Sequence, residues 1–291
     1  MLSILIPTYN YDCYDLVKEL NQQACQCNIK FEIIVIDDCS TLNITNNQKL
    51  NTLPHTQYIK LNNNIGRSKI RNLLADKAIY PYLLFMDCDA EVCSKHYIPE
   101  YLKHCQPNCC IVGGTAYDPK ENNPQYSLRL KYGRLREGNQ TYTKRFTTFN
   151  FLIHKDLFNK VKFNESIRDY GHEDSLFGAQ IKKISNITTI NNPLIHKGLD
   201  TNDIFIKKTE TAIYNLLKLS QSNIINDLLP ESTILQTYKK LKKYHLTTLI
   251  NIAFCTTKKC IQKQISSKNP SLFLFDCYKI GYLCHIASKK Q

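Results

Sequence analysis

The first ninety residues alternate between short apolar runs and longer amphipathic stretches. The apolar runs cover residues 2–6, 31–36, 57–61 and 82–86. Between them, residues 15–24 and the stretch after Gly66 repeat apolar side chains with helical periodicity. Short apolar runs bounded by turn residues are typical of buried strands. The alternation predicts right-handed βαβ units, and therefore an α/β fold with a Rossmann-like, mostly parallel sheet flanked by helices.

Polar loops follow three of these runs, at residues 7–10, 37–40 and 87–89. Because open α/β sheets bind ligands at the carboxyl ends of their strands, we expect the three loops to lie together. Asp87 and Asp89 are two residues apart on an extended chain, so their side chains point to the same side. Two carboxylates there suit a divalent cation that keeps some of its waters and also takes diphosphate oxygens. A strand that simply ends in acidic turn residues is the alternative.

Four segments, read in chain order, resemble the motifs of family 2 glycosyltransferases of the GT-A fold. They are Ile-Pro-Thr-Tyr-Asn (6–10), Val-Ile-Asp-Asp-Cys-Ser (35–40), Asn-Ile-Gly-Arg-Ser-Lys-Ile-Arg-Asn (64–72) and Phe-Met-Asp-Cys-Asp (85–89). The resemblance implies a nucleotide-diphospho-sugar donor, with Mn²⁺ or Mg²⁺ held on its diphosphate by Asp87 and Asp89. The residues expected around the donor are Pro7, Thr8, Tyr9, Asn10, Asp37, Asp38, Asn64, Gly66, Arg67, Arg71, Asp87 and Cys88. For the two arginines, a solvated helix face is the alternative.

Glu173 and Asp174 form a second acidic site, where a helix is predicted to begin. Residues 163–167 and 170–178 are similar to the F-D-E…G-x-E-D segment of the same family, except that Asn164 replaces the usual Asp. The resemblance implies that Asp174 is the general base and that Glu173 holds the acceptor or orients the base. An inverting transfer needs such a carboxylate opposite the anomeric carbon. Negative charge at a helix start can equally be a cap.

The region between the two acidic sites has fewer regular signals. Residues 111–116 and 146–154 read as strands, whereas residues 117–145 are polar, rich in Tyr and Arg, and typical of a loop. His196 ends a further short apolar run. Imidazole suits Mn²⁺, and relatives with this fold often supply a histidine from this region, so His196 is predicted as a third metal ligand beside Asp87 and Asp89. A hydrogen-bonded structural histidine is the alternative.

Charge is distributed unevenly along the 291 residues. The formal net charge is +13, and residues 207–291 hold 14 lysines, no arginine and four acidic residues, which accounts for ten of the thirteen charges. We predict a GT-A domain over residues 1–205 and a basic, mainly helical C-terminal extension over residues 206–291. Lysine-rich amphipathic helices favour peripheral contact with an anionic membrane, although a helical annex with its lysines in water would read the same. The lack of arginine argues against nucleic acid.

Other features bear on the compartment. The sequence contains no run of about 18 apolar residues, which argues against a membrane-spanning helix. The N-terminus lacks the basic and apolar regions of a secretory signal. Thirteen cysteines without C-x-x-C spacing are typical of free thiols in a reducing compartment. We therefore expect a cytoplasmic protein, peripheral on the inner face of the cell membrane.

These observations together predict an inverting, metal-dependent hexosyl- or N-acetylhexosaminyltransferase. It would move a sugar from a nucleotide-diphospho-sugar, with UDP favoured, to a hydroxyl of a glycan or lipid-linked glycan in cell-surface polysaccharide synthesis. A nucleotidyltransferase acting on sugar phosphates is an alternative, but it would normally have a glycine-rich loop where this chain has Pro-Thr-Tyr-Asn. The second alternative is a non-catalytic module that binds nucleotide sugars. The intact acidic sites argue against it.

Overall fold

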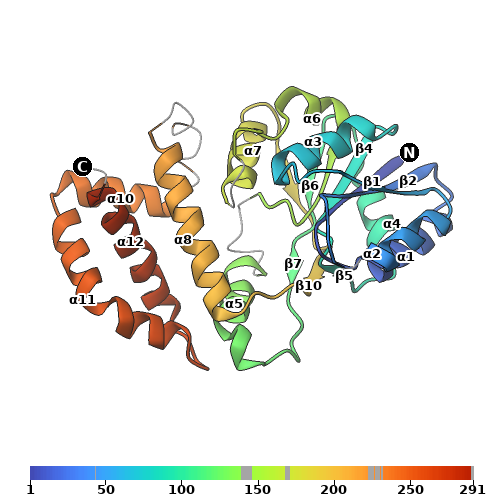
Figure 1. Cartoon of the computed structure of the whole chain (residues 1–291). Helices are drawn as coiled ribbons and strands as arrows, with labels where there is room; N and C mark the ends of the chain where they lie inside the picture. The colour runs from blue at the N-terminus through green and yellow to red at the C-terminus, as the bar shows by residue number, and fades with distance from the viewer. Residues whose placement is uncertain are drawn as a thin grey trace.

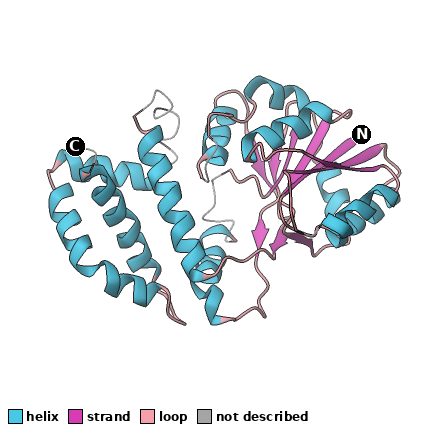
Figure 2. Ribbon diagram, in the orientation of Figure 1, coloured by secondary structure: helices cyan, strands magenta, loops and turns pink. Residues whose placement is uncertain are grey.

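A seven-stranded sheet organises the N-terminal two thirds of the structure, which is a computed structural model (Figures 1 and 2). The structure describes residues 1–42, 44–138, 146–167, 171–221, 226, 230 and 232–289. The strand order is β3-β2-β1-β4-β8-β6-β9. These strands are β1 (Leu2–Thr8), β2 (Phe31–Asp37), β3 (Thr56–Lys60), β4 (Tyr82–Met86), β6 (Cys110–Val112), β8 (Asn150–His154) and β9 (Ile187–Thr189).

The pairing explains why the loops that follow β1, β2 and β4 lie at one edge. Strands β1 to β4 are parallel to one another, whereas β8 runs antiparallel between β4 and β6. The β1–β2 register runs from Leu2 opposite Phe31 to Thr8 opposite Asp37. The predicted mixture of a mostly parallel sheet and flanking helices is confirmed.

Helices cover both faces of the sheet, and the alternation of side chains along each strand divides them between two cores. Leu2, Ile4 and Ile6 of β1 pack on the side of α1 and α4, whereas Leu5 packs with α3, α6 and α7. Both sets are fully buried. The helices of these two layers are α1 (Tyr14–Gln26), α2 (Ile44–Gln48), α3 (Arg67–Lys77), α4 (Tyr97–Leu102), α6 (Lys155–Val161) and α7 (Glu173–Lys182).

A second, three-stranded sheet lies below the first, in the order β5-β10-β7 (Figure 1). Its strands are β5 (Ala90–Val92), β7 (Thr115–Ala116) and β10 (Leu194–His196). The single strand predicted over residues 111–116 is therefore two strands in different sheets. The break falls at Gly113 and Gly114, because Gly114 has a φ of +95° and a Cβ on Gly113 would lie 2.3 Å from the hydroxyl of Tyr101.

The stretch predicted as a loop over residues 117–145 contains helical structure where the structure describes it. Helix α5 (Ser127–Tyr132) continues into a π-helical turn, η3 (Gly133–Glu137). Residues 139–145 lie outside the described residues. Buried Leu128, with Phe205 and Phe275, anchors α5 to the C-terminal helices. Periodicity is not visible in so short a helix because tertiary packing, not an amphipathic pattern, stabilises it.

The C-terminal helices are α8 (Asn202–Leu219), α10 (Thr233–Lys243), α11 (Thr247–Ile265) and α12 (Leu272–Ser288). Figure 1 shows α8 between the sheet and the outer helices α11 and α12. The predicted domain boundary at 205/206 falls inside α8, and the division itself stays a prediction. The amphipathic stretch 238–250 is the corner at which α10 passes into α11. None of the described helices combines the length and the apolar composition needed to cross a bilayer.

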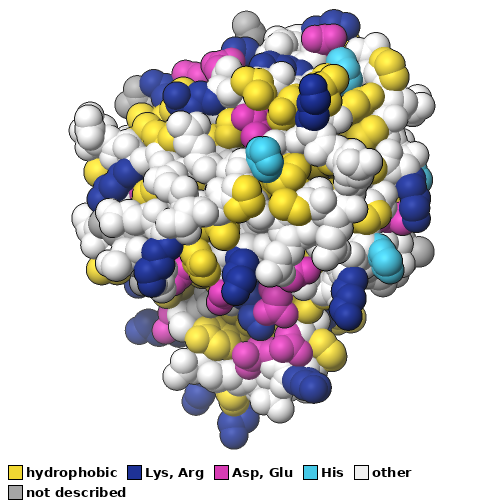
Figure 3. All heavy atoms as spheres, turned by 90° about the vertical axis from the view of Figure 1, so that its right-hand side faces the viewer, with side chains coloured by type: hydrophobic (Ala, Val, Ile, Leu, Met, Phe, Trp, Pro, Cys, Tyr) yellow, Lys and Arg dark blue, Asp and Glu magenta, His cyan; other side chains and the backbone are white. Residues whose placement is uncertain are grey.

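The end of the molecule opposite the C-terminal helices carries charges of both signs (Figure 3). The face formed by the N-terminal strands and helices mixes acidic and basic side chains, and its hydrophobic side chains form separate groups (Figure 3). Ten of the thirteen excess positive charges of the chain lie in residues 207–291.

Candidate active site

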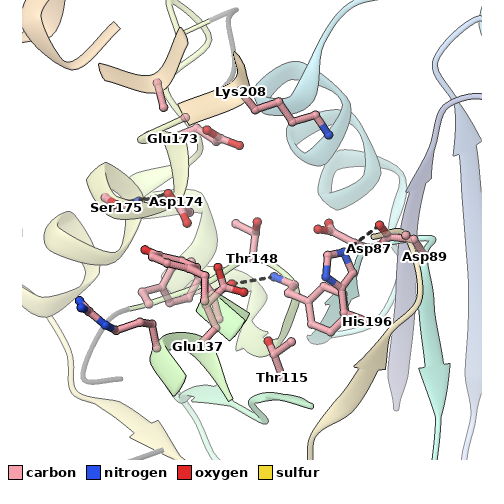
Figure 4. Close-up of a pocket in the computed structure, with 18 of the residues that line it drawn as sticks. Asp87, Asp89, Thr115, Glu137, Thr148, Glu173, Asp174, Ser175, His196 and Lys208 are labelled. Carbon is pink, nitrogen blue, oxygen red and sulfur yellow. Dashed lines mark hydrogen bonds and ion pairs between the residues drawn. The ribbon is translucent and has the colours of Figure 1, made fainter. Parts of the chain in front are cut away.

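A cavity of about 410 Å³ lies between the carboxyl edge of the sheet, the start of α7 and the helices α5 and α8. Of the residues predicted from the sequence, Arg67, Asp87, Asp89, Glu173, Asp174 and His196 line it. Asp87 and Asp89 lie on the opposite side of the cavity from Asp174 (Figure 4). The structure therefore brings the two acidic sites, which are far apart in the sequence, to one cavity.

Asp87 and Asp89 have different partners. Arg71, which is 3% exposed, donates from Nη2 to Oδ1 of Asp87 over 2.7 Å. Nε2 of His196 lies 3.0 Å from Oδ2 of Asp89. Gly198 leaves the space that Asp89 occupies, since a Cβ there would lie 2.2 Å from Oδ2 of Asp89. The two carboxylates are thus held by the fold rather than left on a mobile loop.

The carboxylates of Asp87 and Asp89 fit a divalent cation that takes its remaining ligands from a diphosphate. Oδ1 of Asp89 is buried and has no hydrogen-bond partner among the described residues. Among the described residues, no group of three or more His, Cys, Asp or Glu side chains could hold a metal ion by itself. Mg²⁺ and similar ions usually take one or two carboxylates and complete their shell with water and substrate phosphates, so the incomplete set is compatible with such an ion.

The acidic pair opens α7. His172 precedes it in the left-handed conformation, with φ of 76°. Glu173 is buried, receives a hydrogen bond from Nη1 of Arg67 over 3.3 Å, and keeps Oε2 without a partner among the described residues. Asp174 accepts hydrogen bonds from the backbone N–H and the hydroxyl of Ser175. Burial, and then the negative charge of Glu173, raise the pKa of Asp174 to about 6. A carboxylate with a pKa near neutral is suited to general base chemistry.

The residues predicted around the nucleoside surround the carboxyl ends of β1 and β2, and most of their polar atoms are used within the fold. Asp37 is fully buried and accepts from the backbone N–H of Ser40 over 2.6 Å and from the Tyr58 hydroxyl over 2.5 Å. Asp38 accepts from the backbone N–H groups of Ile65 and Gly66. Both carboxylates therefore hold loops in place.

The other predicted donor residues lie in the same loops. Asn10 receives hydrogen bonds on Oδ1 from the backbone N–H of Thr41 and Leu42, so it ties the first loop to the second. Asn64 donates to the carbonyl oxygen of Asp38 over 3.1 Å. Tyr9 is 55% exposed. Pro7 and Thr8 end β1, and Cys88 is partly buried between the two aspartates.

Several lining residues belong to no motif or periodic pattern in the sequence. Tyr117, Arg129 and Glu137 come from the stretch that lacks periodicity, and Lys208 comes from α8, beyond the predicted domain boundary. Lys208 pairs with Asp200 over 2.7 Å. Burial raises the pKa of the Tyr117 hydroxyl far above its usual value, with the charge of Glu137 adding to the effect. The abundance of Arg and Tyr was the only hint, and it did not tell which side chains face the cavity.

Comparison with known proteins places this geometry in a family. The model of "Glycosyl transferase family 2" matches residues 3–168. A teichoic acid poly(glycerol phosphate) polymerase from Staphylococcus epidermidis is 23% identical over 183 residues, which are 58% of this chain and 24% of that protein. The chain thus spans about a quarter of that curated relative.

Solved structures agree with the fold. A mannosyltransferase from Pyrobaculum calidifontis, solved with GDP-Man and Mn²⁺, superposes with a TM-score of 0.61 at 14% identity, covering 99% of this chain and 86% of that one. Residues 1–349 of Staphylococcus aureus TarS, also solved with UDP-GlcNAc, superpose with a TM-score of 0.52 at 16% identity, covering 99% and 91%. The match over more than half of the sequence decides the family. The chain belongs to glycosyl transferase family 2 and is a glycosyltransferase with the GT-A fold.

Proposed function

We propose that this glycosyltransferase is an inverting, metal-dependent enzyme that moves a sugar from a nucleotide-diphospho-sugar to a hydroxyl of a glycan or lipid-linked glycan. The observation that carries the proposal is the placement of Asp174, with its pKa raised to about 6, across one cavity from Asp87 and Asp89 (Figure 4). A single displacement needs these two functions on opposite sides of the anomeric carbon.

The reaction follows from that placement. Asp174 accepts the proton of the acceptor hydroxyl, and the freed oxygen bonds to the anomeric carbon while the bond to the donor diphosphate breaks. Because attack and departure occur on opposite faces, the configuration inverts. The unpartnered Oε2 of Glu173 is placed to accept a hydrogen bond from the acceptor. Arg67 holds the other oxygen of Glu173 and so keeps this carboxylate aimed at the cavity.

Asp87 and Asp89 would hold Mn²⁺ or Mg²⁺, which supplies positive charge to the leaving diphosphate. The unpartnered Oδ1 of Asp89 supports this role. Of the residues that the structure describes, six carboxylates and four Lys or Arg side chains line the cavity, so the positive charge of a cation would favour the binding of a diphosphate there. His196 as a third ligand stays a prediction of the sequence.

The donor would bind with its nucleoside at the loops after β1 and β2. The proposed contacts come from Pro7, Thr8, Tyr9, Asn10, Asp37, Asp38, Asn64 and Gly66, with Arg67, Arg71 and Cys88 nearer to the diphosphate. Exposed Tyr9 offers a ring to the base. UDP is the proposed nucleotide, and the UDP-GlcNAc complex of TarS supports it, whereas the GDP-Man complex of the mannosyltransferase makes GDP the competitor.

The acceptor proposal rests on the surface of the C-terminal extension. Four large apolar side chains at the α10–α11 corner are between 41% and 65% exposed, and they are Tyr244, Leu246, Leu249 and Ile252. Exposed lysines at 239, 240, 242 and 243 precede them. Exposed apolar side chains beside lysines favour the surface of an anionic bilayer. We therefore propose a cytoplasmic enzyme that contacts the inner membrane face and acts in cell-surface polysaccharide synthesis.

A screen of nucleotide sugars tests the proposal, with released nucleotide as the readout and Asp174→Asn as the negative control. We expect release from one UDP-sugar, stimulated by Mn²⁺ and by a glycan acceptor. Release of pyrophosphate from a nucleoside triphosphate and a sugar phosphate would instead identify a nucleotidyltransferase. Nucleotide binding by calorimetry without any turnover would identify a non-catalytic module.

A further inference from the structure

We propose that Arg129 is a positioning residue that connects the C-terminal helices to the Asp89–His196 pair and thereby sets the affinity of the site for a divalent cation. The inference rests on the proposed function in one respect, namely that the cation binds at Asp87 and Asp89. It goes further in assigning a role to a residue, and to a group of helices, that no motif identifies.

Arg129 is held on all sides. The residue is 8% exposed. Nη1 donates to Oε2 of Glu137 over 2.9 Å, and Nη2 donates to Nδ1 of His196 over 3.2 Å. The guanidinium lies 5.3 Å from the ring centre of Tyr117 and 5.2 Å from that of Phe205. Two directional hydrogen bonds and two ring faces leave the guanidinium a single orientation.

The chemistry of the guanidinium determines how His196 meets Asp89. Arginine can only donate hydrogen bonds, so Nδ1 of His196 accepts and carries no hydrogen. The ring hydrogen then lies on Nε2, which donates to Oδ2 of Asp89 over 3.0 Å. This bond fixes the carboxylate so that its buried, unpartnered Oδ1 is the atom presented to a cation. With both ring nitrogens used in this way, His196 acts as an outer partner of Asp89 and not as the third ligand predicted from the sequence. Such outer partners of metal-binding side chains orient them and tune affinity.

The position of Arg129 depends in turn on the C-terminal helices. Asn202 of α8 accepts from the backbone N–H of Leu128 over 2.9 Å and donates to the Ser127 hydroxyl over 3.1 Å. Ser127 itself donates to the carbonyl oxygen of Ser267 over 2.7 Å, in the turn between α11 and α12. Helix α5 is thus clamped from the side of the molecule that the family model, which ends at residue 168, does not cover.

A purely structural role for Arg129, as the buried partner of Glu137, is the competing interpretation. A substitution of Lys131 distinguishes the two interpretations. Lys131 lies on the same helix as Arg129 and donates to Asn269 over 2.8 Å, but it does not line the cavity. If Arg129 only anchors α5, Arg129→Met and Lys131→Met should both affect stability and leave cation binding alone.

The experiment is a Mn²⁺ titration of the purified full chain, without donor, in which electron paramagnetic resonance measures free Mn²⁺. We expect Arg129→Met to weaken binding about 10- to 100-fold and Lys131→Met to leave it unchanged. Arg129→Lys keeps the charge but cannot make both hydrogen bonds, so its affinity should fall between those of the wild type and Arg129→Met. This milder variant also serves if Arg129→Met does not fold, as judged by circular dichroism.

Two negative results have different meanings. A folded Arg129→Met or Arg129→Lys protein that binds Mn²⁺ as tightly as the wild type overturns the inference and leaves the proposed function standing. A wild-type protein that binds neither Mn²⁺ nor Mg²⁺ overturns the metal part of the proposed function, and the role of Arg129 with it.

Discussion

Gly171 packs directly against Ala212 of α8, since a Cβ on Gly171 would lie 2.8 Å from the Cβ of Ala212. The φ of Gly171 is +105°, a conformation that favours glycine. Nε2 of His172, the next residue, lies 3.0 Å from the carbonyl oxygen of Ala212 and donates to it. The loop that leads into the acidic pair therefore rests on a helix of the C-terminal half.

Gly171→Ala should lower kcat by about tenfold or more, because the new methyl group pushes the start of α7 away from α8 and small misplacements of a catalytic group are costly. Steady-state kinetics with saturating donor would measure it. Combining the change with Ala212→Gly should recover part of the loss, since space is restored while the backbone strain remains. Equal activity of Gly171→Ala and wild type would contradict the packing argument.

The pH dependence of transfer should follow Asp174. A base must be deprotonated to act, so the rate should rise with pH through about 6, the raised pKa of this carboxyl. Asp174→Asn should reduce kcat at least a hundredfold and leave binding of UDP nearly intact. Asp156→Asn, at an exposed site on α6, is the matched control and should have the wild-type profile.

Stability should fall with rising pH over the range in which the rate of transfer rises, and the same carboxyl of Asp174 is the cause. Its pKa is higher in the folded than in the unfolded chain, so ionisation is disfavoured by folding and stability falls as pH rises through about 6. Asp174→Asn should therefore raise the melting temperature at pH 8 and change it little at pH 4. A gain of the same size at both pH values would show that burial of the charge is not the cause.

The metal carboxylates should couple cation and nucleotide. Calorimetry is expected to show that Mn²⁺ tightens UDP binding to the wild type and that Asp89→Ala removes most of this enhancement. In the presence of EDTA the variant should bind UDP at least as tightly as the wild type, because without the cation the Asp89 carboxylate only repels the diphosphate. Glu91→Ala, which breaks the exposed pair with Lys197, is the control and should keep the Mn²⁺ effect.

Replacing Asp37 should lower the stability of the fold, because its carboxylate holds loops in place. With an amide, the oxygen can still accept from the Ser40 N–H, but the Tyr58 hydroxyl has to accept where it now donates. Two hydrogen bonds to a carboxylate become bonds to a neutral amide, so Asp37→Asn should cost about 1–3 kcal/mol of unfolding free energy. Tyr58→Phe leaves one oxygen of the buried carboxylate without its partner and should cost about 1–3 kcal/mol as well. Urea denaturation measures both. Full stability together with lost UDP binding would instead favour a direct contact to the nucleoside.

The α10–α11 corner should bind anionic vesicles. Leu249→Ser combined with Ile252→Ser should reduce co-sedimentation with vesicles of anionic lipid while transfer to a water-soluble acceptor is unchanged. Ile79→Ser with Ile184→Ser removes equally exposed apolar side chains from the GT-A domain and should have no effect. Equal binding of the wild type to neutral and anionic vesicles would refute the role of the lysines.

The elements that could be predicted from the sequence are those with a strong local period. Strand β4 and the aspartates that follow it illustrate this, because alternation alone places Asp87 and Asp89 on one side of the chain. The start of α7 at Glu173 also agrees with the predicted acidic helix start. Both are local features whose geometry depends on neighbours in the chain.

The rest of the cavity depends on contacts between distant segments. Arg129 reaches His196 across 67 positions of sequence, and no pattern within α5 marks it. Composition places Lys208 among the lysines of a basic tail, yet it lines the cavity because α8 passes beside it. For Asp37 the acidic turn was visible, but not that Tyr58 and Ser40 would take both oxygens. Such pairings are decided by tertiary packing.

Helix α8 has a consequence for how the protein can be divided. One of its faces carries Lys208 and Ala212 to the cavity, and another packs Ile206, Ile213 and Leu217 against the outer helices. A chain cut at residue 205 would lose a wall of the cavity as well as the extension. The C-terminal helices therefore cannot be exchanged between relatives like an interchangeable tail, because each replacement would have to rebuild the wall of the cavity that α8 supplies.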